Sequence, residues 1–480
     1  MSESTQQYDN DCLVLQDLSG RDRPAKRKAL QALDLALKST LEHEIIFDKL
    51  LSTLLHCTAS AIDGIREQAV NLIIRSVQKT IDLDSNMGMS IITKASERLK
   101  PGVEPTEETR AEWLVIVQKV VTKTSKLGVK DVEVLLDVAQ IGIEDAFPEA
   151  QKQAGKLLVS LAREAPVLVG YAGEKPLHMA TTLLVHRHSA LRVLGLEAVE
   201  AILLRNARYV DVLFVQDQST GRAPIVPTLM YDHAPQVRLA LVQAVGRLFA
   251  AWPPSDRYNH AHQLLPVILT SSVDGFPQVV QAAQDMIALL GKQCAQDLVD
   301  SGLLDTLGED AQVMGLMHVV HMAWEKTLKS LLHDIQHFIA TRQITALSVL
   351  NLLVGFAAPK DVTRSLNRIL HQLIVTYCTA PDSLVRIKTV EVASVLATKV
   401  PLPDIYLDIL LPHLQKGHWT AETGAYPTAT VLTAVLALLD ALLNTPEQNI
   451  SIPAKDRIKS ALSKDHITSI LPTGLNKFVN

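Results

Sequence analysis

Apolar residues recur at helical spacing along this chain, and the same apolar and polar pattern returns about every 42 residues. The clearest copy begins with the apolar segment 264–269 and continues through Asp274 and Pro277 into a second apolar segment. The copy before it has the apolar segment 225–229, followed by Asp232 at the matching position. Apolar residues three and four apart indicate the buried face of a helix, and Asp or Pro between two such runs indicates a turn. Each copy therefore predicts two helices joined by a short turn.

The first turn of the second helix provides a marker for aligning the copies. The aligned residues are Lys26, Arg66, Arg110, Gln151, Arg192, Arg238, Val280, Arg342, Arg386 and Thr428. Successive markers lie 40 to 46 residues apart, apart from one step of 62 residues between Val280 and Arg342. Helical pairs with this period are typical of the HEAT and armadillo class of repeats. The sequence thus predicts an all-α fold, an α-solenoid of about ten HEAT-type, armadillo-like helical pairs.

The repeat spacing divides the chain into five segments. We expect an N-terminal tail and cap over residues 1–20 and a first array of HEAT repeats over residues 21–295. The long step indicates an irregular inserted segment at 296–323, before a second array at 324–443. The remaining residues, 444–480, are expected to form a half repeat or a C-terminal cap, because the end of a solenoid needs a polar cover.

Composition agrees with thin helical layers and argues against several classes of protein. Hydrophobic residues make up 48% of the chain and aromatic residues only 4%, which suits closely stacked helices. The net charge of −5 argues against a general nucleic-acid-binding protein, which is usually basic. The longest uncharged stretches, 343–359 and 423–439, coincide with expected repeat helices. We therefore expect neither nucleic-acid binding nor a membrane span.

The cysteines point to a reducing compartment. Cys12, Cys57, Cys294 and Cys378 are scattered, with no closely spaced pair, and such a pattern indicates free thiols rather than a disulfide framework. Residues 1–20 have no basic start and no apolar core, so no secretory signal is expected there. Together these features predict a cytosolic or nuclear protein.

Catalytic, cofactor-binding and metal-binding motifs are missing from the sequence. The phosphate-binding GxxxxGK[ST], nucleophile GxSxG and zinc-binding HExxH patterns are all absent. The best candidate ligands are His333 and His337, whose i, i+4 spacing would place them on one face of a helix. A third ligand at suitable local spacing is lacking, so packed or solvated histidines are the favoured interpretation. We therefore expect no enzyme activity, no cofactor and no bound metal.

Two kinds of residue are candidates for binding a protein partner. Equivalent repeat positions are occupied by Arg66, Arg110, Arg192, Arg238, Arg342 and Arg386. A row of guanidinium groups there would bind an acidic peptide or phosphates, with Arg192, Arg238 and Arg386 as the candidate binding residues. The alternative, which we favour, is that each arginine pairs with an aspartate in an adjacent turn and ties neighbouring repeats together. Trp252 and Trp419 lie in expected connections. There an exposed ring would anchor a partner, whereas a buried ring would pack against the neighbouring repeat.

Three features of the chain resemble a known family. A segment rich in Arg, Lys, Ala and Leu, residues 23–37, opens the array, and helical pairs fill the rest of the chain. The copy at 264–290 is followed directly by Gly291, Lys292 and Gln293. Together these features are similar to the family of HEAT-repeat dynein axonemal assembly factors.

The resemblance implies a non-enzymatic cytoplasmic scaffold that helps to preassemble axonemal dynein arms before their export to cilia. The partners that it implies are a dynein intermediate chain and chaperones, and it supplies no catalytic residues to carry over. The rival interpretations are a HEAT-repeat adaptor in nuclear transport, microtubule regulation or phosphatase scaffolding, and an enzyme built on helical repeats. A tubulin-binding array should carry basic and aromatic loop tips, and a transport receptor should carry an acidic cargo surface. The sequence shows neither strongly.

Overall fold

The protein folds entirely into helices over the residues that the structure describes. The computed structural model describes residues 22–39, 43–124, 126–216, 221, 223–308, 310–400, 402–414, 428–445, 450–463, 467 and 471–478. Every regular element in these ranges is a helix, which confirms the all-α solenoid prediction. The chain divides into two compact units, Met1–Thr228 and Leu229–Asn480. The tail and cap predicted at 1–20 lie outside the described residues.

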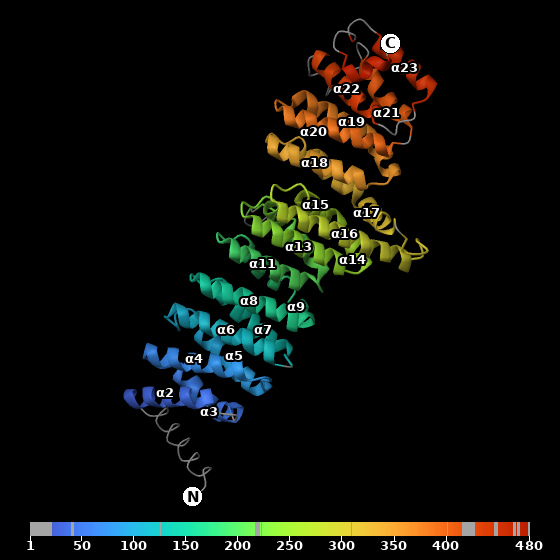
Figure 1. Cartoon of the computed structure of the whole chain (residues 1–480). Coiled ribbons are helices and arrows are strands. Elements are labelled where there is room, and N and C mark those ends of the chain that lie inside the picture. The colour runs from blue at the N-terminus through green and yellow to red at the C-terminus, as the bar shows by residue number, and fades with distance from the viewer. Residues whose placement is uncertain are drawn as a thin grey trace. The chain divides into compact units, whose positions relative to one another are not determined.

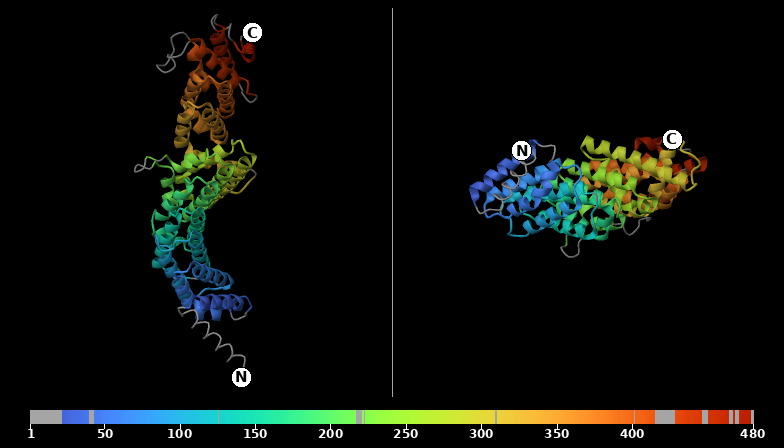
Figure 2. Two further views of the ribbon diagram at one scale, coloured as in Figure 1. Left: turned by 90° about the vertical axis from the view of Figure 1, so that its left-hand side faces the viewer. Right: turned by 90° about the horizontal axis from the view of Figure 1, so that it is seen from below.

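The first unit is a stack of helical pairs. Its elements are α2 (Arg23–Ser39), α3 (His43–Cys57), α4 (Asp63–Lys79), α5 (Ser85–Arg98), α6 (Glu107–Lys123), α7 (Val129–Ile143), α8 (Pro148–Glu164), α9 (Pro166–Tyr171), α10 (Lys175–Leu184), α11 (Ser189–Leu203) and the 3₁₀ helix η1 (Ala207–Leu213). The first helices of successive pairs, α3, α5, α7 and α10, contact one another in order, and so do the second helices, α4, α6, α8 and α11. The left view of Figure 2 shows these two adjoining rows in blue and teal.

The second unit is also built of helical pairs. Its elements are α13 (Pro235–Ala251), α14 (Pro254–Asn259), α15 (Ala261–Ser271), α16 (Pro277–Asp300), α17 (Ala311–Asp334), α18 (Ala340–Phe356), α19 (Pro359–Thr379), α20 (Ser383–Lys399), α21 (Pro403–Leu410), η2 (Leu411–Leu414), α22 (Thr428–Leu443), α23 (Ile452–Leu462) and η4 (Thr473–Phe478). A short helix, α12 (Ile225–Leu229), spans the residues at which the two units divide. Figure 1 shows the pairs from α15 to α22 stacked in chain order.

The proline and aspartate residues that mark the repeats in the sequence lie where helices begin. Pro148, Pro235 and Pro277 are the first residues of α8, α13 and α16. At that position the backbone N–H has no partner within the helix, so its loss costs nothing. Asp382 precedes α20, and its carboxylate accepts a hydrogen bond from the Leu384 N–H at 2.7 Å. These residues therefore mark the first turn of the second helix in these four pairs.

Helix α13 shows how a repeat forms its core. Val237, Leu241, Ala244, Val245 and Leu248 form the stripe i, i+4, i+7, i+8 and i+11, and none of them is more than 5% exposed. This stripe packs where α13 contacts α15 and α16. Burying a Val or Leu side chain contributes about 1.5–3 kcal/mol. The predicted buried face is confirmed.

The segment 296–323, predicted as an irregular insertion, consists of regular helix and one connection. It comprises the end of α16, residues 301–310 and the first half of α17. Both helices have 24 residues, whereas α13 and α18 have 17. The additional length is about two turns in each helix. The long step in the repeat spacing corresponds to these two lengthened helices and their connection, and an insertion at 296–323 stays a prediction.

Helices α16 and α17 pack against each other backbone to backbone. A Cβ atom on Gly315 would lie 2.2 Å from the carbonyl oxygen of Gly291 and 2.4 Å from the backbone nitrogen of Ala295. A Cβ atom on Gly291 would lie 2.8 Å from the carbonyl oxygen of Gln312. No other residue type has room at these two positions, so the glycines allow the close approach of the two long helices.

The described part of the C-terminal tail packs on the last helical pair. Helix α23 contacts α21, and η4 contacts α22. Ala454, Ile458 and Leu462 form the buried face of α23. This segment therefore covers apolar surface at the end of the second unit.

Candidate protein-binding surfaces

Five arginines, here called the ladder arginines, share one position and one contact. They are Arg66, Arg110, Arg192, Arg238 and Arg386, each the fourth residue of the second helix of its pair. In every case the Nη1 group donates a hydrogen bond to the carbonyl oxygen six residues earlier, in the preceding turn. The shared helix position explains the shared contact, because it places each guanidinium group at the same position relative to the preceding turn.

Two ladder arginines also bind the turn aspartate of the next repeat through two hydrogen bonds. Nε and Nη2 of Arg110 donate to the two carboxylate oxygens of Asp145 at 2.7 and 3.0 Å. Arg238 makes the same contacts with Asp274 at 2.6 and 2.9 Å. Each aspartate also accepts, at 2.8 Å, a hydrogen bond from the backbone N–H two residues later. The arginine thus joins its own turn to the turn of the next repeat by charge-assisted hydrogen bonds.

Arg66 makes a related contact with a shared carboxylate. Its Nε and Nη2 groups lie 3.3 and 3.2 Å from Oε1 of Glu104, and Arg98 donates to Oε2 of the same residue. The Thr106 N–H donates to Oε1 at 3.3 Å. The Glu104 side chain is fully buried, and removing one member of such a group leaves an uncompensated charge in the interior. Loss of one member of this cluster should therefore destabilise the first unit.

The pKa shifts agree with formed ion pairs. Burial raises the pKa of the Asp145 carboxyl group, but hydrogen bonds from Arg110 and from a backbone N–H outweigh burial, and the net pKa is lowered. The hydrogen bonds to Asp274 raise the pKa of Arg238 despite its burial. Only 13% of the Arg238 side chain and 10% of the Asp274 side chain are exposed. The favoured interpretation, pairing with an adjacent turn, is confirmed for Arg110 and Arg238.

The other two candidate arginines are also held by turn carbonyls. Arg192 is buried and donates to the carbonyl oxygens of His186 at 2.8 Å and Arg187 at 3.1 Å. Arg386 is half-buried and donates to the Ala380 carbonyl at 2.8 Å. A role of Arg192, Arg238 and Arg386 in partner binding stays a prediction.

Two of the sequence markers fall in the wrong register. Helix α18 begins at Ala340, so Gln343 rather than Arg342 holds the fourth position, and its amide donates to the Ile335 carbonyl at 3.0 Å. The Arg342 guanidinium group lies instead over the ring of Tyr231, 5.3 Å from its centre. Thr428 is the first residue of α22 and not the fourth.

The tryptophan at the end of α13 is not an exposed anchor. Trp252 is 1% exposed, and its ring meets the edge of His260 with 5.7 Å between centres. The Trp252 ring is therefore packed inside the array, as in the second alternative. Its burial gives no support to a contact with a partner. Trp419 lies outside the described residues.

A buried arginine that the sequence did not single out links three helices. Arg257 of α14 is 2% exposed and donates to the carbonyl oxygens of Phe249 and Trp252 at 2.8 and 2.6 Å. Its Nη1 group also binds Asp297 of α16, which accepts a second hydrogen bond from Tyr258 at 2.8 Å. Arg257 thus caps the C-terminus of α13 and ties α14 to α16. The sequence did contain one indication of this contact: Arg257 and Asp297 are 40 residues apart, which is close to the repeat period.

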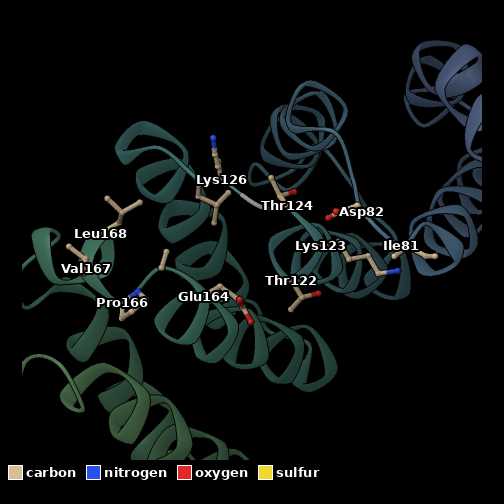
Figure 3. A pocket seen from close by; sticks show the side chains of 12 residues that line it. Ile81, Asp82, Thr122, Lys123, Thr124, Lys126, Glu164, Pro166, Val167 and Leu168 are labelled. Carbon is tan, nitrogen blue, oxygen red and sulfur yellow. The ribbon is translucent and has the colours of Figure 1, made fainter.

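A hollow of about 670 Å³ lies in the first unit, where three connections between repeats meet. Its lining residues are Ile81, Asp82, Thr122, Lys123, Thr124, Lys126, Leu127, Glu164, Ala165, Pro166, Val167 and Leu168. Figure 3 shows their side chains spread around a broad opening rather than converging on one point. The Lys123 ammonium group donates to the Gln78 and Thr80 carbonyls at 2.8 and 2.5 Å. It therefore caps a helix end and is not placed as a catalytic base.

The histidine candidates do not assemble into a ligand set. Helix α17 ends at Asp334, so His337 lies in the following turn and not one helical turn beyond His333. His321 Nδ1 lies 2.8 Å from a carboxylate oxygen of Asp361. Within the described ranges, no group of three His, Cys, Asp or Glu residues could hold a metal ion. In the same ranges, no helix combines the length and the apolar character that crossing a membrane requires.

Two protein-family models match the chain in consecutive ranges. The model for "Dynein axonemal assembly factor 5-like, TPR repeats" matches residues 17–298, which is more than half of the chain. The model for "Dynein axonemal assembly factor 5, HEAT-repeat domain" matches residues 305–473. The chain belongs to the dynein axonemal assembly factor 5 family. The resemblance found in the sequence is thereby confirmed.

Relatives in the dynein axonemal assembly factor 5 family are distant in sequence. The Homo sapiens protein is 24% identical over 481 residues, which covers 95% of this chain and 53% of that protein. The Xenopus laevis protein is 22% identical over 419 residues, which covers 83% of this chain and 48% of that protein. The chain thus spans about half the length of these curated relatives. The fold is also similar to a crystal structure of importin beta. That match covers all of this chain and 62% of the importin beta chain, at 13% identity and a TM-score of 0.38, which is too low to carry a functional conclusion.

The two ranges matched by the dynein axonemal assembly factor 5 family models meet at the α16–α17 connection. The first model is described as TPR repeats, whose period is about 34 residues. The sequence markers in that range are 40 to 46 residues apart, which is closer to the HEAT period. By its period, the N-terminal part of this family member is HEAT-like.

Proposed function

We propose that the chain is a non-enzymatic scaffold for the preassembly of axonemal dynein arms. It would act in the cytoplasm, bind a dynein intermediate chain and work alongside chaperones. The observation that carries the proposal is the match of the dynein axonemal assembly factor 5 family models to residues 17–298 and 305–473. The names of the relatives connect the family with dynein assembly, and the partner and the location are inferred from that connection.

The physical design of the chain supports this proposal. Stacked repeats present long surfaces on which many side chains share the contact with a partner. The ladder contacts from Arg110 to Asp145 and from Arg238 to Asp274 hold successive turns in fixed positions. A surface held in this way binds a partner with a smaller loss of conformational entropy.

Removing the gene from its own ciliated host tests the proposal. We expect cilia to form but to lack dynein arms, and the dynein intermediate chain to accumulate unassembled in the cytoplasm. Re-expression of the intact chain should restore the arms. Intact arms and normal beating in the deleted strain would contradict the proposal and favour a general HEAT-repeat adaptor.

A further inference from the structure

The end of the α16–α17 hairpin presents an apolar surface to solvent. We call residues 300–308 and 310–314, which include the last residue of α16, the described part of the connection and the first turn of α17, the hairpin tip. Leu303 is 71% exposed, Leu307 52%, Val313 60% and Met314 42%. Figure 1 shows this connection in yellow at the right of the second unit, beyond the end of α14. Four exposed large apolar side chains within twelve residues are unusual, because exposed apolar residues on protein surfaces are normally scattered singly.

The packing of the hairpin explains why its own helices do not cover these side chains. Gly291 and Gly315 bring the two backbones into contact close to the tip. Gly302 has a φ of 71°, and the Leu303 N–H donates to the Leu298 carbonyl at 2.9 Å. This arrangement closes α16 and turns the chain outward. The apolar side chains are therefore held at the surface by the backbone of the tip.

The charged residues of the hairpin tip itself are all acidic. The sequence from Gln293 to Glu325 contains no lysine or arginine. Asp300, Asp305 and Asp310 are exposed at the tip. Acidic groups around an apolar surface attract a cationic ligand and repel an anionic one. The tip thus combines apolar contact area with a negative field.

We propose that the hairpin tip is a docking site for a basic amphipathic helix of a partner protein. The apolar face of that helix would cover Leu303, Leu307 and Val313, and its lysine or arginine side chains would lie beside the exposed aspartates. A helix is favoured over an added β-strand, because the hairpin offers helices and no sheet edge with which a strand could pair. The acidic groups also disfavour an anionic membrane surface as the ligand. This inference goes beyond the proposed function, since it holds for whichever protein supplies the helix.

A direct binding measurement with the full chain tests this site. The probe is a fluorescent peptide of about 18 residues made of leucine and lysine. The leucines are spaced three and four residues apart, so that the peptide forms an amphipathic helix with leucine on one face and lysine on the other. We expect saturable binding that weakens with added salt. Leu303→Ser together with Leu307→Ser should weaken binding by about tenfold or more, as for central apolar contacts of an interface. Asp300→Asn, Asp305→Asn and Asp310→Asn together should weaken binding and reduce its dependence on salt.

Three controls make the result specific to the tip. Phe338→Ser removes an apolar side chain that is 89% exposed at the other end of α17, and it should leave binding unchanged. A peptide with glutamate in place of lysine should bind much more weakly. Circular dichroism should show that every variant keeps its helical content, since all the changed residues are exposed. Equal binding by wild type and the leucine variant, equal binding of the acidic peptide, equal loss in Phe338→Ser, or preferential binding to anionic lipid vesicles would overturn the proposal.

Discussion

Arg238 and Asp274 are 36 residues apart in the sequence and form a two-bond ion pair between neighbouring turns of the array. The same arginine donates to the backbone carbonyl of Asp232 in its own turn. One side chain therefore connects the turn before its own helix with the turn before the second helix of the next repeat. The repetition of this contact at Arg110 and Asp145 makes it a general tie between layers.

Arg238→Ala should lower the free energy of unfolding of the chain by about 1–3 kcal/mol, because Asp274 and a turn carbonyl lose their partner. Urea unfolding followed by circular dichroism measures the change. Arg368→Ala is the matched control, since its ion pair with Glu325 is about half-exposed on both sides and should contribute less than about 1 kcal/mol. Equal effects of the two substitutions would contradict the account of the ladder.

Gly315→Ala should destabilise the α16–α17 hairpin, because the added methyl group would overlap the Gly291 carbonyl. Overpacking of this kind typically costs about 1–3 kcal/mol. Gly355→Ala in α18 is the control, because nothing lies within 4 Å of the added Cβ atom. That change should be neutral, or stabilising by up to about 1 kcal/mol through helix propensity. Thermal unfolding of the two variants distinguishes these results, and equal stability would show that the helices are not in close contact.

The Asp145 ion pair should give a stability contribution that depends on pH. The folded-state pKa of this carboxyl group is lowered below its usual value of 3.8. The contribution is therefore fully present above that value and is lost as pH falls through the lower, folded-state pKa. The difference in unfolding free energy between wild type and Asp145→Asn should be large near neutral pH and should shrink in strong acid. Asp137→Asn, at a carboxylate that is 64% exposed, should show a smaller change, and a difference for Asp145 that grows on acidification would contradict the assignment.

The thiols should react slowly in the folded protein. Burial raises the pKa of Cys294 to about 11 and that of Cys378 to about 11, and it also raises the pKa of Cys57. At neutral pH little thiolate is present, and the thiolate is the reactive form. In a Cys12→Ser variant, we expect a chromogenic disulfide reagent to label these three thiols slowly without urea and rapidly with it. Rapid labelling of all three in the folded state would contradict the burial of Cys57 and Cys294 and the raised pKa of Cys378.

Much of the fold followed from the sequence because repeat contacts are local and periodic. The spacing of Val237, Leu241 and Leu248 identified a buried face without knowledge of its neighbours. The pairing of Arg238 with Asp274 followed from their equivalent places in successive repeats. Both predictions rest on positions that recur with the repeat.

Other features depended on packing that no local pattern records. The close packing of α16 on α17 depends on the contact between Gly291 and Gly315, which spacing alone does not reveal. The role of Arg257 depends on the convergence of carbonyl groups at the end of α13 with Asp297 of α16. The burial of Trp252 depends on the path of the chain after α13. Each of these arises from three-dimensional contacts, and the hairpin tip emerged from the structure for the same reason.

The most direct test of the proposed function is binding of the purified full chain to a purified axonemal dynein intermediate chain. Size-exclusion chromatography and isothermal titration calorimetry would detect the complex. The account predicts a saturable complex of defined stoichiometry, which weakens modestly with single surface substitutions because many residues share the contact. Failure of the folded chain to bind the intermediate chain at any accessible concentration would contradict the account.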